Sequence, residues 1–121
     1  MEYKYFELVD HGEVLLARIK QAAILDQMII DQIAREMVAV QLEAAGGRKL
    51  LLDFRSVNFM SSAMLGKLVS LHKSCKADKI KLKFCGISDN VMEVFKITRL
   101  NKIFEIFPDE AAGVASFGKG I

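Results

Sequence analysis

An apolar run that ends in a turn and two hydroxyl side chains most constrains how this chain folds. Residues 50–52 are three consecutive leucines, which is typical of a strand covered on both faces of a sheet. The strand ends at Asp53 and a short turn follows, and Ser61 and Ser62 then precede a run with the spacing of an amphipathic helix. A central strand that leads into a helix in this way predicts an α/β fold.

Strands and helices are predicted to alternate along the rest of the chain. Residues 3–9 and 14–19 are strand-like and are joined by the turn-forming residues 10–13, so they predict an antiparallel hairpin. Three helix–strand pairs and a last helix follow, which gives the order ββαβαβαβα. Alternation of this kind implies parallel strands joined by right-handed crossovers. We therefore expect a mixed, mostly parallel sheet in a single domain, residues 1–121.

Capping residues and periodicity place the predicted elements more closely. Asp26 is expected to cap the first helix, and Gly46-Gly47 to end it in left-handed backbone. The second helix begins at the serine pair. Two more strands are predicted, at 79–84 with one face in water and at 103–107. A helix between them is capped by Ser88, Asp89 or Asn90, with a capping box from Asn90 to Glu93. A short last helix is opened by Pro108, Asp109 and Glu110.

Charge and cysteine usage narrow the classes of function. The 121 residues include 17 Lys and Arg and 15 Asp and Glu, for a net charge of +2. We interpret this basic excess as too small and too scattered for a nucleic-acid surface. No apolar run approaches the roughly 18 residues of a membrane span, and no signal segment opens the chain. Because Cys75 and Cys85 form no Cys-x-x-Cys motif, we expect a cytoplasmic protein whose free thiols fill the core.

No residue pattern predicts an enzyme, a metal centre or a cofactor. His11 falls in a turn and His72 on the core side of a helix, where structural roles are commoner than catalysis. Gly66-Lys67 lacks the preceding glycine and the following Ser or Thr of a phosphate-binding loop. Asp53 is expected to accept hydrogen bonds from the loop that it precedes.

The serine pair has two interpretations. Backbone N–H groups at the start of a helix lack partners and carry partial positive charge, so a phosphate on a serine there would be stabilised. Serine is also a preferred N-cap, and at most helix starts it has that role alone. From residue type, a plain cap is the commoner case and a regulatory phosphorylation site is the alternative.

The sequence at 53–66 resembles the signature of the STAS domain of anti-sigma factor antagonists. In that signature a strand ending in Asp leads to an aromatic-Met/Ile-Asp-Ser-Ser/Thr-Gly-Leu-Gly segment. The resemblance continues at 24–26, 87–91 and 100–104, so it covers the whole domain. It implies a bacterial signalling protein that regulates transcription through protein–protein interaction and is not itself an enzyme.

The resemblance also implies the residues of the site. Ser62 aligns with the phosphorylated serine of the family, and Ser61 is the second choice. The family's partners are an anti-sigma factor that is a serine kinase, whose binding ends when the serine is phosphorylated, and a phosphoprotein phosphatase. The expected contact surface is Asp26, Ser61, Ser62, Ala63, Met64 and Lys67.

Two alternatives remain open from the sequence. Ser61, Ala63 and Met64 stand where the signature has Asp, Ser or Thr, and Gly. These departures leave room for a STAS subunit without phosphoryl control in a larger signalling or transport assembly. A nucleotide-binding role is known for some STAS domains, but this chain has no Gly-rich loop. The kinase, the sigma factor and the oligomeric state are not predicted.

Overall fold

The computed structural model describes residues 2–118 and has a five-stranded mixed sheet at its centre. β1 (Phe6–His11) pairs antiparallel with β2 (Val14–Ile19), which forms the predicted hairpin. β4 (Lys49–Asp53), β6 (Leu82–Cys85) and β7 (Ile106–Phe107) continue the sheet in parallel, in the spatial order β1-β2-β4-β6-β7. The predicted α/β fold is confirmed. Met1 and residues 119–121 of the predicted domain lie outside the described residues.

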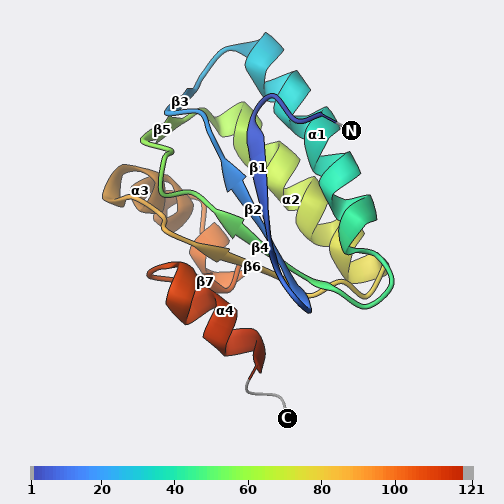
Figure 1. Cartoon of the computed structure of the whole chain (residues 1–121). Coiled ribbons are helices and arrows are strands. Elements are labelled where there is room, and N and C mark those ends of the chain that lie inside the picture. The colour runs from blue at the N-terminus through green and yellow to red at the C-terminus, as the bar shows by residue number, and fades with distance from the viewer. Residues whose placement is uncertain (1, 119–121) are drawn as a thin grey trace.

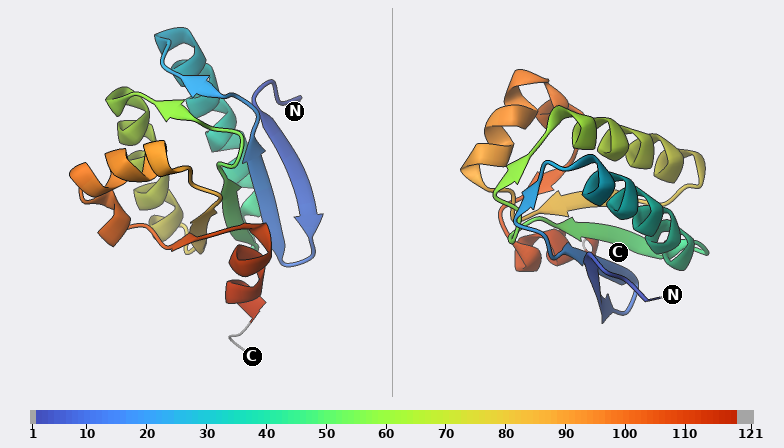
Figure 2. Two further views of the ribbon diagram at one scale, coloured as in Figure 1. Left: turned by 90° about the vertical axis from the view of Figure 1, so that its left-hand side faces the viewer. Right: turned by 90° about the horizontal axis from the view of Figure 1, so that it is seen from above.

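Helices cover both faces of this sheet (Figures 1 and 2). α1 (Gln27–Ala44), α2 (Ser62–Ala77) and α3 (Asp89–Ile97) enclose the larger core, and α4 (Glu110–Gly118) packs on the opposite face. Alternate residues of β4 point to opposite faces, as in any strand. The side chains at positions 50 and 52 enter the larger core, and that at 51 enters the smaller one. The central strand is therefore buried on both faces, as predicted.

The first helix begins and ends where the sequence predicted. Asp26 caps α1, because its carboxylate oxygen Oδ1 accepts the backbone N–H of Met28 at 2.8 Å. Ile33, Met37 and Val40 share the spacing of the inner stripe and are all buried. The helix ends before two glycines whose positive φ angles match the predicted left-handed stop. Local sequence alone therefore specified this element.

The strand predicted at 79–84 begins later than expected. Lys79 has φ 60°, a left-handed conformation that a strand does not contain, and β6 starts at Leu82. The expected wet face is also partly covered. The amine of Lys83 lies 4.5 Å from the ring centroid of Phe117 on α4 and 5.3 Å from that of Phe107. The prediction was wrong here because α4 packs over this end of the sheet.

The last predicted strand is mostly replaced by a turn. η1 (Leu100–Lys102) is a short 3₁₀ helix, and the N–H of Phe104 donates to the carbonyl of Leu100 at 2.9 Å. Only Ile106–Phe107 of the predicted 103–107 pairs with β6.

At α3 the cap is Ser88, which was one of three predicted candidates, so the capping box from Asn90 was wrong.

Two very short strands were not predicted. β3 (Ala23–Ile24) and β5 (Phe59–Met60) pair in parallel and form a second, two-stranded sheet. Each has only two residues, which is too short for an alternating pattern to be recognised. Each leads directly into one of the two long helices, so this small sheet decides where those helices begin.

Close packing at a glycine holds α4 against the sheet. A Cβ atom added to Gly113 would lie 2.8 Å from Cδ2 and 2.9 Å from Cδ1 of Leu51. Leu51 is fully buried at the centre of β4, so its side chain cannot shift away from an added methyl group. Gly113 therefore allows the helix backbone to approach the central strand.

We predict that Gly113→Ala lowers the free energy of unfolding by about 1–3 kcal/mol, because overpacking displaces either the helix or the leucine. Gly66→Ala is the matched control, since Gly66 is an exposed helical glycine with open space around its Cβ direction. This control is expected to gain about 0.4–1 kcal/mol. Urea unfolding followed by circular dichroism measures both. Unchanged stability in Gly113→Ala would contradict the close approach.

Candidate functional site

The small parallel sheet sets the starts of α1 and α2 side by side. Ile24 of β3 lies opposite Met60 of β5, and the N–H of Ser61 donates to the carbonyl of Ile24 at 3.0 Å. Each strand is followed within two residues by a helix cap, which is Asp26 for α1 and Ser61 for α2. Residues far apart in sequence thus meet at one end of the two long helices (Figure 2).

The two serines have different surroundings. Ser61 occupies the N-cap position of α2 but makes no side-chain cap hydrogen bond. Its Oγ is shielded from solvent and has no hydrogen-bond partner within residues 2–118. Ser62 is the first residue of the helix and is exposed. A modifying enzyme therefore has freer access to the hydroxyl of Ser62 than to that of Ser61.

The other residues of the predicted contact surface divide into two groups. Asp26 and Ala63 are exposed, and Lys67 is partly exposed one turn further along α2 than Ala63. Met64 is fully buried, since it shares the inner face of α2 with Leu68. Its inclusion in the contact surface was wrong, because a side chain in the core presents no atoms to a partner.

Three exposed apolar side chains near the helix starts were missed by the sequence analysis. Leu25 is 59% exposed, Met28 80% and Phe59 55%. Leu25 precedes the cap of α1, Met28 lies in its first turn, and Phe59 lies in β5. Exposed large apolar residues that gather at one place are typical of an interaction surface. We call Leu25, Met28, Phe59 and Ser62 the contact face.

Asp53 supports the loop that leads to the serines, as predicted. It is 1% exposed at the end of β4, and its Oδ1 accepts the N–H of Arg55 at 3.0 Å. Its Oδ2 accepts Nε of Arg18 at 2.8 Å. Arg18 also donates to Glu7 at 2.9 Å and to Glu110 at 2.7 Å. The hydrogen bond to Asp53 is the largest factor that raises the pKa of the Arg18 guanidinium.

Comparison with known proteins identifies the family. The model of the STAS domain matches residues 13–113. The chain belongs to the STAS domain family. An anti-sigma-B factor antagonist of Listeria monocytogenes is 37% identical over 60 residues, a match that spans 50% of this chain and 53% of that protein. The match therefore covers about half the length of that relative.

Solved structures share this STAS fold. A STAS domain protein of Planctomyces limnophilus has a TM-score of 0.81 at 19% identity, with 94% of this chain and 98% of that chain covered. The anti-sigma factor antagonist SpoIIAA in its unphosphorylated form has a TM-score of 0.73 at 18% identity, with 96% and 97% covered. These likenesses establish the fold of the domain.

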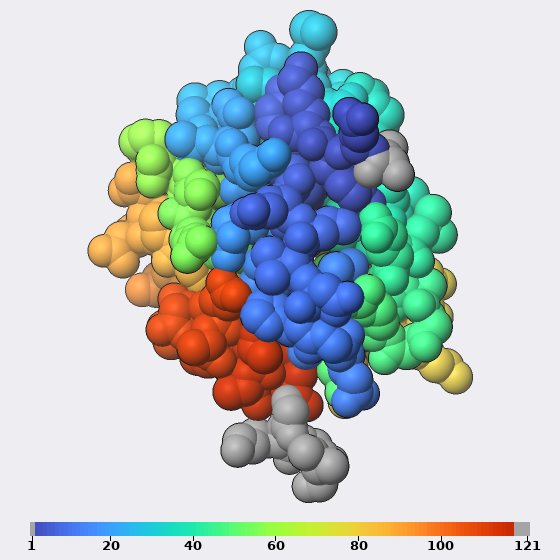
Figure 3. All heavy atoms as spheres, in the orientation of Figure 1, coloured from blue at the N-terminus to red at the C-terminus, as the bar shows by residue number. Residues whose placement is uncertain are grey.

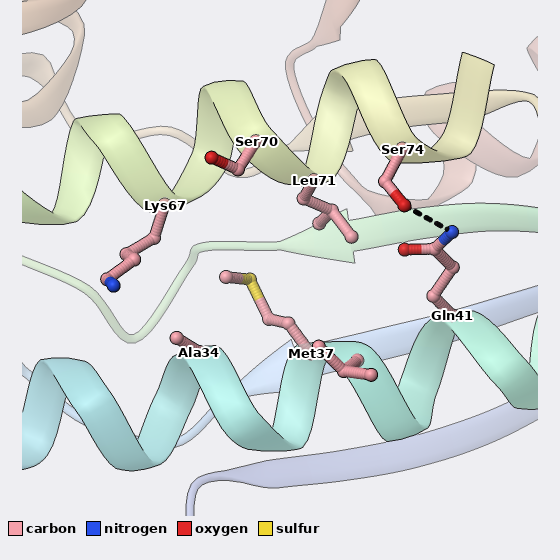
Figure 4. Close-up of a pocket in the computed structure, with 8 residues that line it drawn as sticks. Ala34, Met37, Gln41, Lys67, Ser70, Leu71 and Ser74 are labelled. Carbon is pink, nitrogen blue, oxygen red and sulfur yellow. Dashed lines mark hydrogen bonds between the residues drawn. The ribbon is translucent and has the colours of Figure 1, made fainter. Parts of the chain in front are cut away.

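A groove runs between α1 and α2 of the STAS domain, with a volume of about 280 Å³. Its middle is lined by Met37 and Leu71, which point into the gap between the two helices (Figure 4). At one end the amide of Gln41 donates to the hydroxyl of Ser74 at 2.9 Å. At the other end stands Lys67, on the helix that begins at the contact face. The predicted surface thus continues along the groove.

Reactive side chains elsewhere in the domain are engaged in structure. Burial raises the pKa of the Cys75 thiol to about 11 and that of the Cys85 thiol to about 12, so both thiols stay protonated at neutral pH. The His72 ring packs at an angle on Phe104, with centroids 5.4 Å apart, and His11 lies 3.0 Å from Glu110.

Among the described residues no group of three or more His, Cys, Asp and Glu is placed to hold a metal ion. Within the same part of the chain we find no helix with the length and apolar content of a membrane span.

We predict that Asp53→Asn lowers the free energy of unfolding by about 1.5–3 kcal/mol, because the buried charge-assisted hydrogen bond to Arg18 is lost. Glu7→Gln is the control. It removes another carboxylate from the same guanidinium, but at a half-exposed position, where the cost is under about 1 kcal/mol. Chemical denaturation of both variants measures the difference. An equal loss of stability in the two variants would show that burial does not strengthen the contribution of the Asp53 hydrogen bond.

Proposed function

We propose that this STAS domain is an anti-sigma factor antagonist. It binds an anti-sigma factor with serine kinase activity through the contact face, and phosphorylation of Ser62 ends the binding. The observation that carries this proposal is the exposed hydroxyl of Ser62 at the start of α2, beside apolar side chains that have no cover within residues 2–118. The name of the Listeria relative supports the same function.

The contact face has the composition that reversible binding requires. Fully burying a side chain of the size of Leu, Met or Phe contributes about 1.5–3 kcal/mol, and the face offers three of them. Asp26 adds a carboxylate at its edge. The unmodified serine is small and neutral, so a partner covers it at little cost in desolvation.

Phosphorylation reverses this balance. A phosphate at Ser62 adds about two negative charges close to the carboxylate of Asp26. In the free protein the N-terminus of α2 and water stabilise that charge, whereas in the complex the charge is desolvated. Phosphorylation therefore stabilises the free protein relative to the complex.

The size of the switch requires Ser62 to lie inside the contact. Shifting a partner from almost fully bound to almost fully free takes about 5.5 kcal/mol. A charge at the exposed rim of an interface changes binding by less than about 1 kcal/mol. Ser62 meets this requirement in the proposed complex, because the exposed Leu25 directly follows β3 and the exposed Phe59 opens β5, the paired strands that lead to the two helix starts.

In this proposal the chain is a substrate and not an enzyme. The kinase adds the phosphate, a phosphoprotein phosphatase removes it, and both reactions take place in the cytoplasm.

We predict that the phosphate is found on Ser62 and not on Ser61 or Ser56. The hydroxyl of Ser61 is shielded from solvent, and Ser56 lies in the turn before β5, away from the helix start. Intact-mass measurement of the protein from its own cells, followed by peptide mapping, tests this. A phosphate on Ser61 with Ser62 unmodified would contradict the assignment.

We predict that Ser62→Asp weakens binding to the serine-kinase anti-sigma factor of the same organism by at least tenfold, about 1.4 kcal/mol. Ser62→Ala should bind like the wild type and resist phosphorylation. Ser56→Asp is the matched control, because it adds the same charge at an exposed serine outside the contact face, and its effect should be smaller. Titration calorimetry measures all four proteins.

Two results would count against the proposal in different ways. Equal affinity of the wild type and Ser62→Asp would favour a constitutive STAS subunit without phosphoryl control. Absence of binding in the wild type, with a folded protein, would remove the anti-sigma factor as the partner.

A further inference from the structure

The basic excess of the chain comes from one region of the sequence. Residues 64–104 contain nine Lys and Arg against three Asp and Glu, a net charge of +6. The rest of the chain contains eight against twelve, a net charge of −4. The small total of +2 is the sum of two regions of opposite sign, and it hides a strongly basic one.

A hollow lies within this basic region. Its volume is about 290 Å³, and its lining is His72, Lys76, Ile80, Leu82 and Ile103. Ile80 is buried, whereas Ile103 is 55% exposed at its edge. Two exposed lysines adjoin the lining residues in sequence, at positions 79 and 102, whereas Lys81 lines a separate hollow with Lys83 and Glu105. The hollow therefore has an apolar floor, with Lys76 in its lining and Lys79 and Lys102 next to lining residues in the chain. We call Lys76, Lys79 and Lys102 the rim lysines.

The positive charge of the region is not neutralised within the fold. Of its nine basic residues, only Lys83 forms an ion pair among the described side chains, with Glu105 at 3.4 Å. Asp78 is the nearest acidic residue in sequence to Lys76 and Lys79, and its carboxylate accepts a hydrogen bond from the side-chain amide of Gln41 at 2.8 Å. Glu105, three residues after Lys102, is the residue that pairs with Lys83. The rim lysines are available to an acidic partner.

The hollow is remote from the contact face. Ser62 and Lys76 are fourteen residues apart on α2, which corresponds to about 21 Å along the helix axis. The start and the end of α2 lie at opposite sides of the fold (Figure 1). A protein bound at Ser62 therefore leaves the hollow accessible.

We propose that this hollow binds an acidic segment of a second protein, whose single apolar side chain enters between the lysines. The size of the hollow suits one leucine or phenylalanine side chain, and carboxylates on either side of that residue would meet the rim. This surface is independent of the function proposed for Ser62.

The chemistry of the region favours a protein over other polyanions. Eight of the nine basic residues are lysines and only Arg99 offers the planar fork that suits phosphate groups. A nucleic acid is bound along a basic stripe, whereas three of the five residues that line this hollow are apolar. Of the lining side chains, only Ile103 is apolar and more than half exposed, which is too little for insertion into a bilayer.

The test uses the peptide Glu-Glu-Leu-Glu-Glu, with blocked ends, as the probe. In an NMR titration of the ¹⁵N-labelled protein at low salt, the largest shift changes are expected at the five lining residues. Replacing the leucine of the peptide by alanine should weaken binding by at least about tenfold, because the apolar anchor is lost. The matched peptide Lys-Lys-Leu-Lys-Lys should not bind.

Protein variants separate this site from general electrostatic attraction. Lys76→Glu/Lys102→Glu should abolish binding of the acidic peptide, because Lys76 lines the hollow and the exposed Lys102 precedes the lining residue Ile103. Lys4→Glu/Lys20→Glu changes the net charge equally at exposed positions outside the basic region and should retain binding. Ser62→Asp should bind the peptide like the wild type, so a failed anti-sigma factor proposal leaves this test unaffected. Dispersed NMR spectra confirm that each variant is folded.

Several results would overturn the proposal. These are shift changes that avoid the lining residues, equal affinity for the leucine and alanine peptides, or equal loss of binding in the two double variants. Tighter binding at the same residues by a 20-base-pair duplex DNA or by phosphatidylglycerol vesicles would assign the region to a different class of partner.

Discussion

Complete burial of β4 is the constraint on which the rest of the fold depends. Its three leucines have no exposed surface, and they face two separate cores. A strand buried on both faces needs helices on both sides of the sheet. Here α1, α2 and α3 pack on one face, and α4 packs on the opposite face. The close approach of Gly113 to Leu51 shows how tightly the second cover fits. The position of the central strand thus fixes the places of the four helices of the described chain.

Burial of this strand also carries a charge into the interior at Asp53. An ionised carboxylate without a partner is costly at such a place, and Arg18 from the neighbouring strand neutralises it. The same guanidinium contacts Glu7 and Glu110, so it joins β1, β2, β4 and α4. Figure 3 shows the hairpin and the C-terminal helix lying against each other on that side of the molecule. The loop that begins at Asp53 and ends at the serines therefore starts from a rigid support.

Local sequence determined the elements and the family. Helix caps, glycine stops and apolar periodicity depend on residues that are close in the chain, so Asp26, the leucines of β4 and the start of the second helix were all predictable. The resemblance at 53–66 identified the STAS domain and aligned Ser62 with the phosphorylated serine of the family. Where a prediction failed locally, as at Lys79 and in 103–107, a left-handed residue or a 3₁₀ turn interrupted an apolar pattern that was otherwise correct.

Only the tertiary structure decided which side chains are available to a partner. Met64 and Ser62 are two residues apart, yet one points into the core and the other into solvent, because α2 turns only one face to the sheet. Leu25 and Phe59 come together through pairing of β3 with β5, and Arg18 meets Asp53 through pairing of β2 with β4. The basic hollow likewise combines residues from α2, β6 and the segment after η1. The sequence by itself determined the elements and the serine, because these rest on contacts between near neighbours. The surfaces around them depend on pairings across the fold, which no local pattern contains.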